Sequence, residues 1–218
     1  MKKRLILALI LFSLLSTITF KQKFGFLNLD IKEIKIKNNF IIEDSDIYKL
    51  LTPIYGKNLL ILRNTEIEKA LKQNSFIDSY KIKKKYPNSL ILEIYEKKPI
   101  AILYNKKKKF YLSEKIDLIE YKELENYQTL PSIFGNLDQF KTFYKSLQKI
   151  DFPFVIVKKY ILYDSNRWDL ETNNKKIIKL HFQNYIKNLE NYLNIYKKKE
   201  FKKYSVFDYR LDNQLILK

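Results

Sequence analysis

Residues that could carry out catalysis are few in this chain of 218 residues. His181 is the single histidine and there is no cysteine, so nucleophilic triads and zinc sites have almost no residues to use. Paired carboxylates could serve a glycosidase, but the 24 acidic residues are scattered along the chain. With only three glycines, neither a phosphate-binding loop nor a dinucleotide-binding motif occurs. We therefore expect no catalytic, cofactor or metal site and no small-molecule substrate, and we expect a structural role for His181.

Lysine runs contribute much of the net charge of +18 and raise the question of nucleic-acid binding. The runs at 83–85, 106–109 and 197–199 are placed at turns or exposed faces by the surrounding pattern. They lack the arginine that favours bidentate contacts to bases and phosphates, and no nucleic-acid-binding motif accompanies them. We expect no nucleic-acid partner. Two readings stay open, solvated edges that oppose unwanted strand pairing and weak attraction to anionic lipid headgroups.

The N-terminus has the pattern of a membrane signal-anchor. Sixteen uncharged residues, 5–20, follow Lys2, Lys3 and Arg4 and are closed by Lys21. A helix of this length spans about 24 Å, and lysines at its ends can snorkel to the interface. A cleaved signal peptide is the alternative, but no small-residue cleavage site is present. The sequence predicts a cytoplasmic tail (1–4), a transmembrane helix (5–20) and a juxtamembrane linker (21–28), with the remaining chain across the membrane.

Residues 29–99 predict a small domain with the order β-α-α-β-β. A strand at 29–36 precedes a short helix that Asp44-Ser45-Asp46 can cap. Thr65 and Glu68 have the spacing of a capping box for a second helix. Strands at 76–86 and 90–95 complete the domain, a small α+β module.

Residues 100–218 predict a mixed, β-rich domain with two amphipathic helices, so the chain as a whole is α+β. Apolar residues at helical spacing indicate helices at 137–150 and 183–199. The rest divides into strands and loops: a strand pair in 104–121, a loop at 130–136, strands at 155–164, 166–173 and 176–182, and at 205–218 either two β segments folded around Asp212-Asn213 or one bent strand.

The boundary between the two domains is predicted at Glu96-Lys97-Lys98-Pro99. An alternating strand stops at these residues, and an apolar run resumes immediately after them. Proline removes a ladder donor and keeps the backbone extended, so it suits the end of one domain and the direct start of the next.

The C-terminal strand is the best candidate for an interaction surface. It is the last element, so it can lie at a sheet edge and offer backbone donors and acceptors to a partner strand. Its apolar and aromatic residues are Phe207, Tyr209, Leu211, Leu215 and Leu217.

The stretch 86–101 resembles the closing motif of the POTRA domain in FtsQ/DivIB bacterial cell-division proteins. That motif is roughly aromatic-Pro-x-x-Leu-x-Ile-x-Val-x-Glu-[Arg/Lys]-x-Pro-[Val/Ile]-Ala, and here it reads YPNSLILEIYEKKPIA. Further matches, in the family's order, are Leu130-Pro131 followed by Gly135, Arg167-Trp168-x-Leu170, and Asp208-Tyr209-Arg210-Leu211. The chain departs from the family at Asn38-Asn39, where Gly-Asn is common, and at Leu211, where the family has tyrosine.

The resemblance implies a non-enzymatic, single-pass scaffold of the divisome in the inner membrane at the division septum. The POTRA module would help to recruit the protein. The terminal edge strand of an FtsQ-type β domain would bind small coiled-coil division proteins, FtsB-like and FtsL-like, by strand addition and charged contacts. Tyr209, Arg210 and Leu211 are then the expected partner contacts, with Leu215 supporting them and Arg167 as a charged neighbour.

Three rival readings remain. One is a POTRA-containing periplasmic component of an outer-membrane assembly or secretion machine, although such proteins normally repeat the module or end in a membrane barrel. The second is a secreted hydrolase with an unusual carboxylate site. The third is a basic nucleic-acid-binding protein, which predicts steeply salt-sensitive DNA binding.

Overall fold

The computed structural model describes residues 2–16, 28–106 and 108–218. The chain divides into two compact units between Glu96 and Lys97, which lies within the predicted interruption. The sequence pattern placed Pro99 at the end of the first domain, whereas in the structure Pro99 begins β4 (Pro99–Asn105) of the second unit. The first position of a strand tolerates a residue without an N–H, which explains this placement.

The N-terminal segment forms helix α1 (Lys2–Ser16). Within the described part of the chain, no helix combines the length and the apolar character needed to cross a membrane. The predicted anchor at 5–20 and the predicted linker at 21–28 both include residues outside the described ranges. Both therefore stay predictions.

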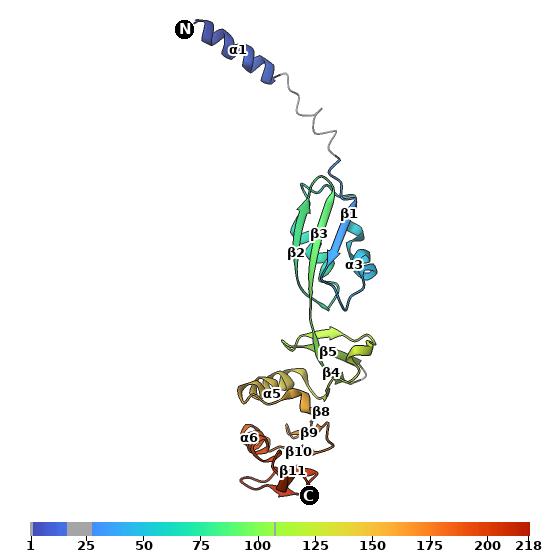
Figure 1. Ribbon diagram of the computed structural model, residues 1–218, viewed down its shortest axis with the longest axis vertical. Helices are drawn as coiled ribbons and strands as arrows, with labels where there is room; N and C mark the ends of the chain where they lie inside the picture. The colour runs from blue at the N-terminus through green and yellow to red at the C-terminus, as the bar shows by residue number, and fades with distance from the viewer. Residues whose placement is uncertain (1, 17–27, 107) are drawn as a thin grey trace. The chain divides into compact units, whose positions relative to one another are not determined.

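Residues 28–96 of the first unit contain a three-stranded sheet and two α-helices in the predicted β-α-α-β-β order. The central strand β3 (Ser89–Glu96) pairs antiparallel with β2 (Ile77–Lys85) and parallel with β1 (Glu33–Lys37). Between β1 and β2 the chain forms α3 (Asp44–Leu51), a short 3-10 turn η1 (Thr52–Ile54) and α4 (Asn64–Leu71) (Figure 1). The predicted α+β class of this region is confirmed.

Along β3 the side chains alternate between fully buried and half-buried, so the two faces of this sheet differ in burial. Leu90, Leu92 and Ile94 are fully buried, and the residues between them are half-buried. Both helices bury one apolar side, with Ile47 in α3 and Ile67 in α4 fully covered. The helices therefore cover one face of the sheet, and neither of them covers the other face in the part of the chain that the structure describes.

Glu96, the last residue of β3, fixes the loop that follows β1. Its carboxylate accepts hydrogen bonds from the backbone N–H groups of Phe40, Ile41 and Ile42 at 2.9, 2.8 and 2.8 Å. Asn38 enters this loop with φ of 64°, a left-handed conformation that asparagine tolerates better than most residues. This accounts for an asparagine at a position where the family often has glycine.

The predicted capping box of the second helix is wrong by two residues, because the N-cap is Arg63 and not Thr65. Helix α4 begins at Asn64, and the Glu66 carboxylate accepts a hydrogen bond from the Arg63 N–H at 3.3 Å. The Thr65 and Glu68 pair proposed from the sequence lies inside the helix. Glu66 also pairs with the Lys57 ammonium, a contact from a distant turn that local spacing does not reveal.

The second unit is built on a nine-stranded sheet with the order β12-β11-β10-β9-β8-β7-β4-β5-β6. Its edges are β12 at one end and β6 at the other. The strands besides β4 are β5 (Lys108–Ser113), β6 (Leu118–Glu120), β7 (Ser132–Phe134), β8 (Val157–Leu162), β9 (Trp168–Thr172), β10 (Ile177–Lys179), β11 (Val206–Asp208) and β12 (Ile216–Leu217). The predicted strand pair within 104–121 is confirmed by β5 and β6, and the first of the two C-terminal alternatives is confirmed by β11 and β12.

The predicted loop at 130–136 is wrong, because it contains β7. This strand is parallel to both of its neighbours, β4 and β8, and it lies in the interior of the sheet. Three residues between Pro131 and Gly135 carry no recognisable alternation, and only Ile133 is fully buried. The strand exists because two longer strands hydrogen-bond to it from either side.

Two α-helices lie along the same side of the sheet (Figure 1) and share one core with it. Helix α5 (Leu137–Lys149) confirms the prediction and is capped by the Asn136 side chain, which accepts from Asp138 N at 2.8 Å. Its Phe143 ring stacks on Trp168 with centroids 4.8 Å apart. The aromatic core therefore fixes this helix on β9.

Helix α6 (Tyr185–Ile195) is shorter than the predicted helix at 183–199. Its fully buried residues are Leu189 and Tyr192. After α6 the lysine-rich stretch turns and forms a 3-10 segment, η4 (Lys199–Phe201). The remaining 3-10 turns are η2 (Glu125–Tyr127) and η3 (Phe154–Ile156).

Candidate functional site

The C-terminal strand β12 forms an open edge of the nine-stranded sheet. It pairs antiparallel with β11, and Val206 and Lys218 exchange two backbone hydrogen bonds of 3.0 and 3.1 Å. Because inward and outward groups alternate in an antiparallel pair, the N–H and C=O of Leu217 point away from β11. No strand among the described residues pairs with this side. The edge therefore offers a backbone donor and acceptor to a further strand.

Apolar side chains surround this edge. Leu211 is 54% exposed and Ile216 is 39% exposed, whereas Leu215 and Leu217 are half-buried against the core. An exposed apolar group beside unpaired backbone groups is typical of a surface that another chain covers. Of the predicted contact residues, Leu211 and Leu215 are thus in position to meet a partner.

Tyr209 differs from its neighbours because it belongs to the core. Its ring is 5% exposed, its hydroxyl donates to Asn191 Oδ1 at 2.9 Å, and burial raises the pKa of that hydroxyl. Its backbone N–H donates to Lys179 O at 2.8 Å. These contacts hold the end of β11 to β10 and α6, so in the free chain Tyr209 stabilises the strand that pairs with β12.

Arg210 is bound to a buried carboxylate. Its Nε donates to the two oxygens of Asp208 at 2.8 and 3.0 Å, and its second guanidinium nitrogen donates at 2.6 Å. Asp208 is 4% exposed, and the Arg210 hydrogen bonds lower the pKa of its carboxyl. The Arg210 side chain itself is 44% exposed, which leaves part of the guanidinium accessible from solvent.

Arg167, which directly precedes β9, makes a similar pair with a buried carboxylate of that strand. Its Nε donates to Asp169 Oδ1 at 3.0 Å, and its guanidinium carbon lies 4.5 Å from the ring centre of Tyr163. Asp169 is 5% exposed, and burial raises the pKa of its carboxyl although the Arg167 hydrogen bond opposes the shift. The two arginines therefore each compensate one buried acid.

The sheet register brings these two pairs together. Asp169 of β9 is opposite Lys179 of β10, and Lys179 is opposite Asp208 of β11. Arg167, Asp169, Lys179, Asp208 and Arg210 thus form what we call the charged row, on the sheet face opposite α5 and α6. It ends beside β12, since Asp208 is also opposite Ile216. The predicted residues Arg167 and Arg210 are distant in sequence, yet they belong to one row of the sheet, with β10 between their strands.

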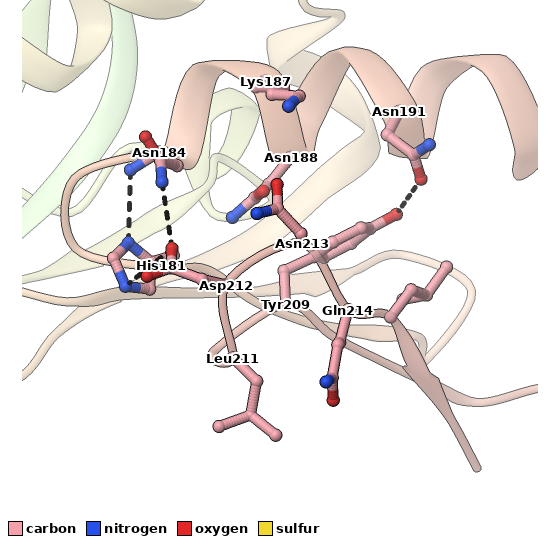
Figure 2. Close-up of a pocket in the computed structure, with 11 residues that line it drawn as sticks. His181, Asn184, Lys187, Asn188, Asn191, Tyr209, Leu211, Asp212, Asn213 and Gln214 are labelled. Atoms are coloured by element: carbon pink, nitrogen blue, oxygen red, sulfur yellow. Dashed lines mark hydrogen bonds and ion pairs between the residues drawn. The ribbon is translucent and has the colours of Figure 1, made fainter.

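A pocket of about 200 Å³ lies on the other side of the edge, between α6 and the β11–β12 connection (Figure 2). Asn184, Asn188 and Asn191 line it from the helix, and Asn213 and Gln214 line it from the connection. The Asn188 side-chain nitrogen is buried and is the one buried side-chain polar atom without a hydrogen-bond partner among the described residues. One residue of the pocket wall, Asn188, therefore has a buried donor that no described residue satisfies.

Sequence reasoning missed this pocket, although one signal was present. The three helical asparagines are spaced four and three residues apart, so they fall on one face of a helix. The residues from the connection carry no such pattern, and only the turn at Asn213, with φ of 53°, places them opposite the helix.

His181 lines the same pocket, and its ring nitrogens contact groups that belong to two different segments of the fold. Its Nδ1 accepts from the backbone N–H groups of Gln183 and Asn184 at 3.2 and 3.3 Å, just before α6. Its Nε2 lies 3.5 Å from Asp212 Oδ1, which also accepts from Asn184 Nδ2 at 3.1 Å (Figure 2). His181 thus ties the start of α6 to the β11–β12 connection. Within the described ranges, no group of three or more His, Asp or Glu side chains is suited to hold a metal ion.

Comparison with known proteins shows that the chain is similar to proteins named for cell division. Residues 29–97 match the family model described as the POTRA domain, FtsQ-type. Cell division protein DivIB of Clostridium botulinum is 34% identical over 128 residues, which are 57% of this chain and 48% of that protein. Cell division protein FtsQ of Rickettsia bellii is 25% identical over 166 residues, 73% of this chain and 60% of that protein. The chain spans about half the length of the curated relatives it matches.

One solved structure shows a weaker likeness. The major extracytoplasmic domain of the cell division protein DivIB from Geobacillus stearothermophilus, in its trans isomer, is 16% identical, with a TM-score of 0.34. The overlap covers 47% of this chain and 92% of that one. A score of this size does not establish a shared fold.

Proposed function

We propose that this chain is a member of the FtsQ/DivIB family of bacterial cell-division proteins and that it acts as a non-enzymatic, single-pass membrane scaffold of the divisome. In this proposal residues 5–20 anchor it with the N-terminus in the cytoplasm, and both compact units lie outside the cytoplasm. The first unit helps to recruit the protein to the septum. The apolar N-terminal segment and the positive charges at Lys2, Lys3 and Arg4 support this orientation.

The open edge of β12 is the observation that carries the partner-binding part of the proposal. A segment of an FtsB-like or FtsL-like coiled-coil protein adds as a further strand and bonds to the outward N–H and C=O of Leu217. Leu211 and Leu215 supply apolar contact, and the exposed part of Arg210 supplies a charge. Arg167 lies farther from β12 along the charged row, so its charge mainly affects the rate at which a charged partner associates.

A POTRA-containing component of an outer-membrane assembly or secretion machine was the alternative from the sequence. The matching relatives are named as division proteins, so this alternative is not favoured. The two functions also predict different cellular phenotypes. Depletion of a divisome scaffold blocks septation and a fluorescent fusion gathers at midcell, whereas uniform envelope staining with normal division would contradict the proposal.

Leu217→Pro tests the edge directly. Proline removes the outward N–H of residue 217, while the inward bonds between Val206 and Lys218 keep their donors. We expect affinity for the FtsB-like and FtsL-like proteins of the same organism to fall about tenfold, because one backbone hydrogen bond is lost and the ring obstructs the incoming strand. The measurement is co-purification followed by a titration of the purified complex.

Leu217→Ala is the matched control, since it removes most of the side chain and keeps the outward N–H. It should bind more tightly than Leu217→Pro. Far-UV circular dichroism and the fluorescence of Trp168 check that both variants are folded. Equal affinity of the proline variant and the unmodified chain would show that no strand is added at β12.

A further inference from the structure

The uncovered face of the three-stranded sheet in the first unit carries a cluster of lysines. Residues that are paired across neighbouring strands project to the same face of a sheet. One row of three contains Lys35, Ile91 and Lys83, and the next contains Lys37, Glu93 and Lys81. A third row contains Glu33, Ser89 and Lys85, and Tyr95 lies opposite Ser79. We call this surface the lysine face, defined by Lys35, Lys37, Lys81, Lys83 and Lys85 around Ile91 and Tyr95.

Side-chain contacts agree with this assignment. Ser89 Oγ donates to Glu33 at 3.0 Å, and the Tyr95 hydroxyl donates to Glu93 at 2.9 Å. The Lys81 ammonium lies 5.1 Å from the ring centre of Tyr95. Contacts along and across the three strands thus join residues of one surface, which the buried Leu90, Leu92 and Ile94 separate from the helices.

The charge of the first unit is concentrated on this face. Residues 29–96 contain twelve Lys and Arg and ten Asp and Glu, so the domain is close to neutral. The lysine face has five of the basic residues and only Glu33 and Glu93 of the acidic ones. Lys37, Lys83 and Lys85 are exposed and form no ion pair with any described residue. The face is therefore positive, and the rest of the domain is slightly negative.

We propose that the lysine face docks onto the anionic headgroups of the membrane that residues 5–20 enter. This inference rests on the anchor in the proposed function. Lysines are flexible, strongly hydrated point charges, which suit a fluid layer of phosphates better than a partner with fixed geometry. The half-buried Ile91 and Tyr95 at the centre provide the apolar and amphipathic groups that prefer the interface.

The length of the connecting chain permits this contact. Residues 21–32 join the predicted anchor to β1 and span at most about 40 Å when fully extended. A domain tethered this closely meets the membrane surface at a high effective concentration, so a modest attraction is enough to orient it. An acidic protein partner is the competing occupant, and the following experiment separates the two.

The experiment places the full chain in vesicles and measures how close the lysine face lies to the lipid. The chain has no cysteine, so Ser79→Cys carries a single fluorescent donor at the border of the face, and the vesicles carry a headgroup-linked acceptor. We expect stronger energy transfer in vesicles of phosphatidylcholine with phosphatidylglycerol than in phosphatidylcholine alone. The difference should disappear at high salt, because exposed charges are screened.

Two triple variants make the test specific. Lys37→Gln, Lys83→Gln and Lys85→Gln together should lower the ratio of docked to free domain by about a hundredfold, or about fivefold for each lysine. Lys49→Gln, Lys69→Gln and Lys72→Gln change the net charge equally on or beside the helices and should leave the transfer unchanged. Equal transfer from both vesicles, or equal loss in both variants, would overturn the proposal. So would a lysine-face variant that keeps its lipid proximity and loses a co-purifying acidic protein.

Extraction with alkaline carbonate distinguishes failure of the anchor from failure of the face. A chain that carbonate removes from the vesicles is not membrane-spanning, and the proposed anchor is then wrong. In that case flotation of the chain with phosphatidylglycerol vesicles still tests the face, since it must depend on Lys37, Lys83 and Lys85. Absence of such flotation refutes the docking inference independently.

Discussion

Arg210→Ala is expected to destabilise the second unit as well as to weaken partner binding. Arg210 makes three side-chain hydrogen bonds to Asp208, whose carboxylate is 4% exposed. Without the guanidinium, the fold keeps a buried carboxylate that has lost its principal donors. A binding assay on this variant would therefore mix two effects unless stability is measured alongside it.

The size of the effect follows from the exposure of the two partners. Removal of one partner from a fully buried ion pair typically costs about 3–5 kcal/mol. The Arg210 side chain is 44% exposed, so water can replace part of its contribution and we expect a loss of about 2 kcal/mol. For a domain of this size, that loss corresponds to a urea midpoint lower by roughly 1 M.

The assay is urea unfolding of the full chain followed through Trp168. This residue is the single tryptophan and is 5% exposed in the core of the second unit, so its fluorescence reports on that unit. Asp208→Asn in combination with Arg210→Ala is the control. The double variant should be more stable than Arg210→Ala alone, with a coupling energy of about 1–2 kcal/mol, because no unpaired carboxylate remains.

The pH dependence gives a second test of the same pair. The pKa of Asp208 is lowered in the folded chain, so its stabilising contribution is complete above the unfolded-state pKa of about 3.9 and is lost as the pH falls below it. The gap between the unmodified chain and Arg210→Ala should thus be full at neutral pH and shrink as the pH falls, first when the unpaired Asp208 carboxyl of the variant takes up a proton and finally when that of the unmodified chain does. Burial raises the pKa of Asp169, so its contribution to stability increases as the pH falls. Both proteins contain Asp169, so this contribution largely cancels when their unfolding free energies are subtracted. A variant as stable as the unmodified chain at neutral pH, or a gap that does not change in acid, would refute this reasoning.

Two further predictions concern one substitution in each unit. Glu96→Ala should destabilise the first unit by about 2–4 kcal/mol, since it removes the carboxylate that accepts from the N–H groups of Phe40, Ile41 and Ile42. The loss of stability should appear in unfolding followed by far-UV circular dichroism, while the unfolding transition of Trp168 in the second unit stays unchanged. Gly135→Ala should lower the stability of the second unit by about 1–3 kcal/mol, because a Cβ at residue 135 would lie 2.7 Å from Leu162 Cβ and the φ of Gly135 is 159°. An unchanged midpoint of unfolding, followed through Trp168, would contradict this prediction.

Local patterns in the sequence determined the elements that are long enough to show a period. The order of the first unit follows from alternation in 90–95 and from apolar spacing in two short helices, and α5 follows from its apolar stripe. Chemistry was also limited by composition, because a chain with one histidine and no cysteine has few routes to a nucleophile or a metal site. The sequence pattern also indicated a C-terminal strand, and the sheet order has β12 at an edge.

Tertiary structure decided which of these residues are neighbours. Three residues at 132–134 become an interior strand only because β4 and β8 pair with them. The charged row joins Arg167 to Arg210 through the register of β9, β10 and β11, and the pocket places Asn188 of α6 opposite Asn213. Tyr209 resembles an exposed strand residue in sequence and is a core residue in the fold. The physical reason is that periodicity records only which face of its own element a residue occupies. Strand pairing across long separations, which local sequence does not encode, selects the residues that meet at the site.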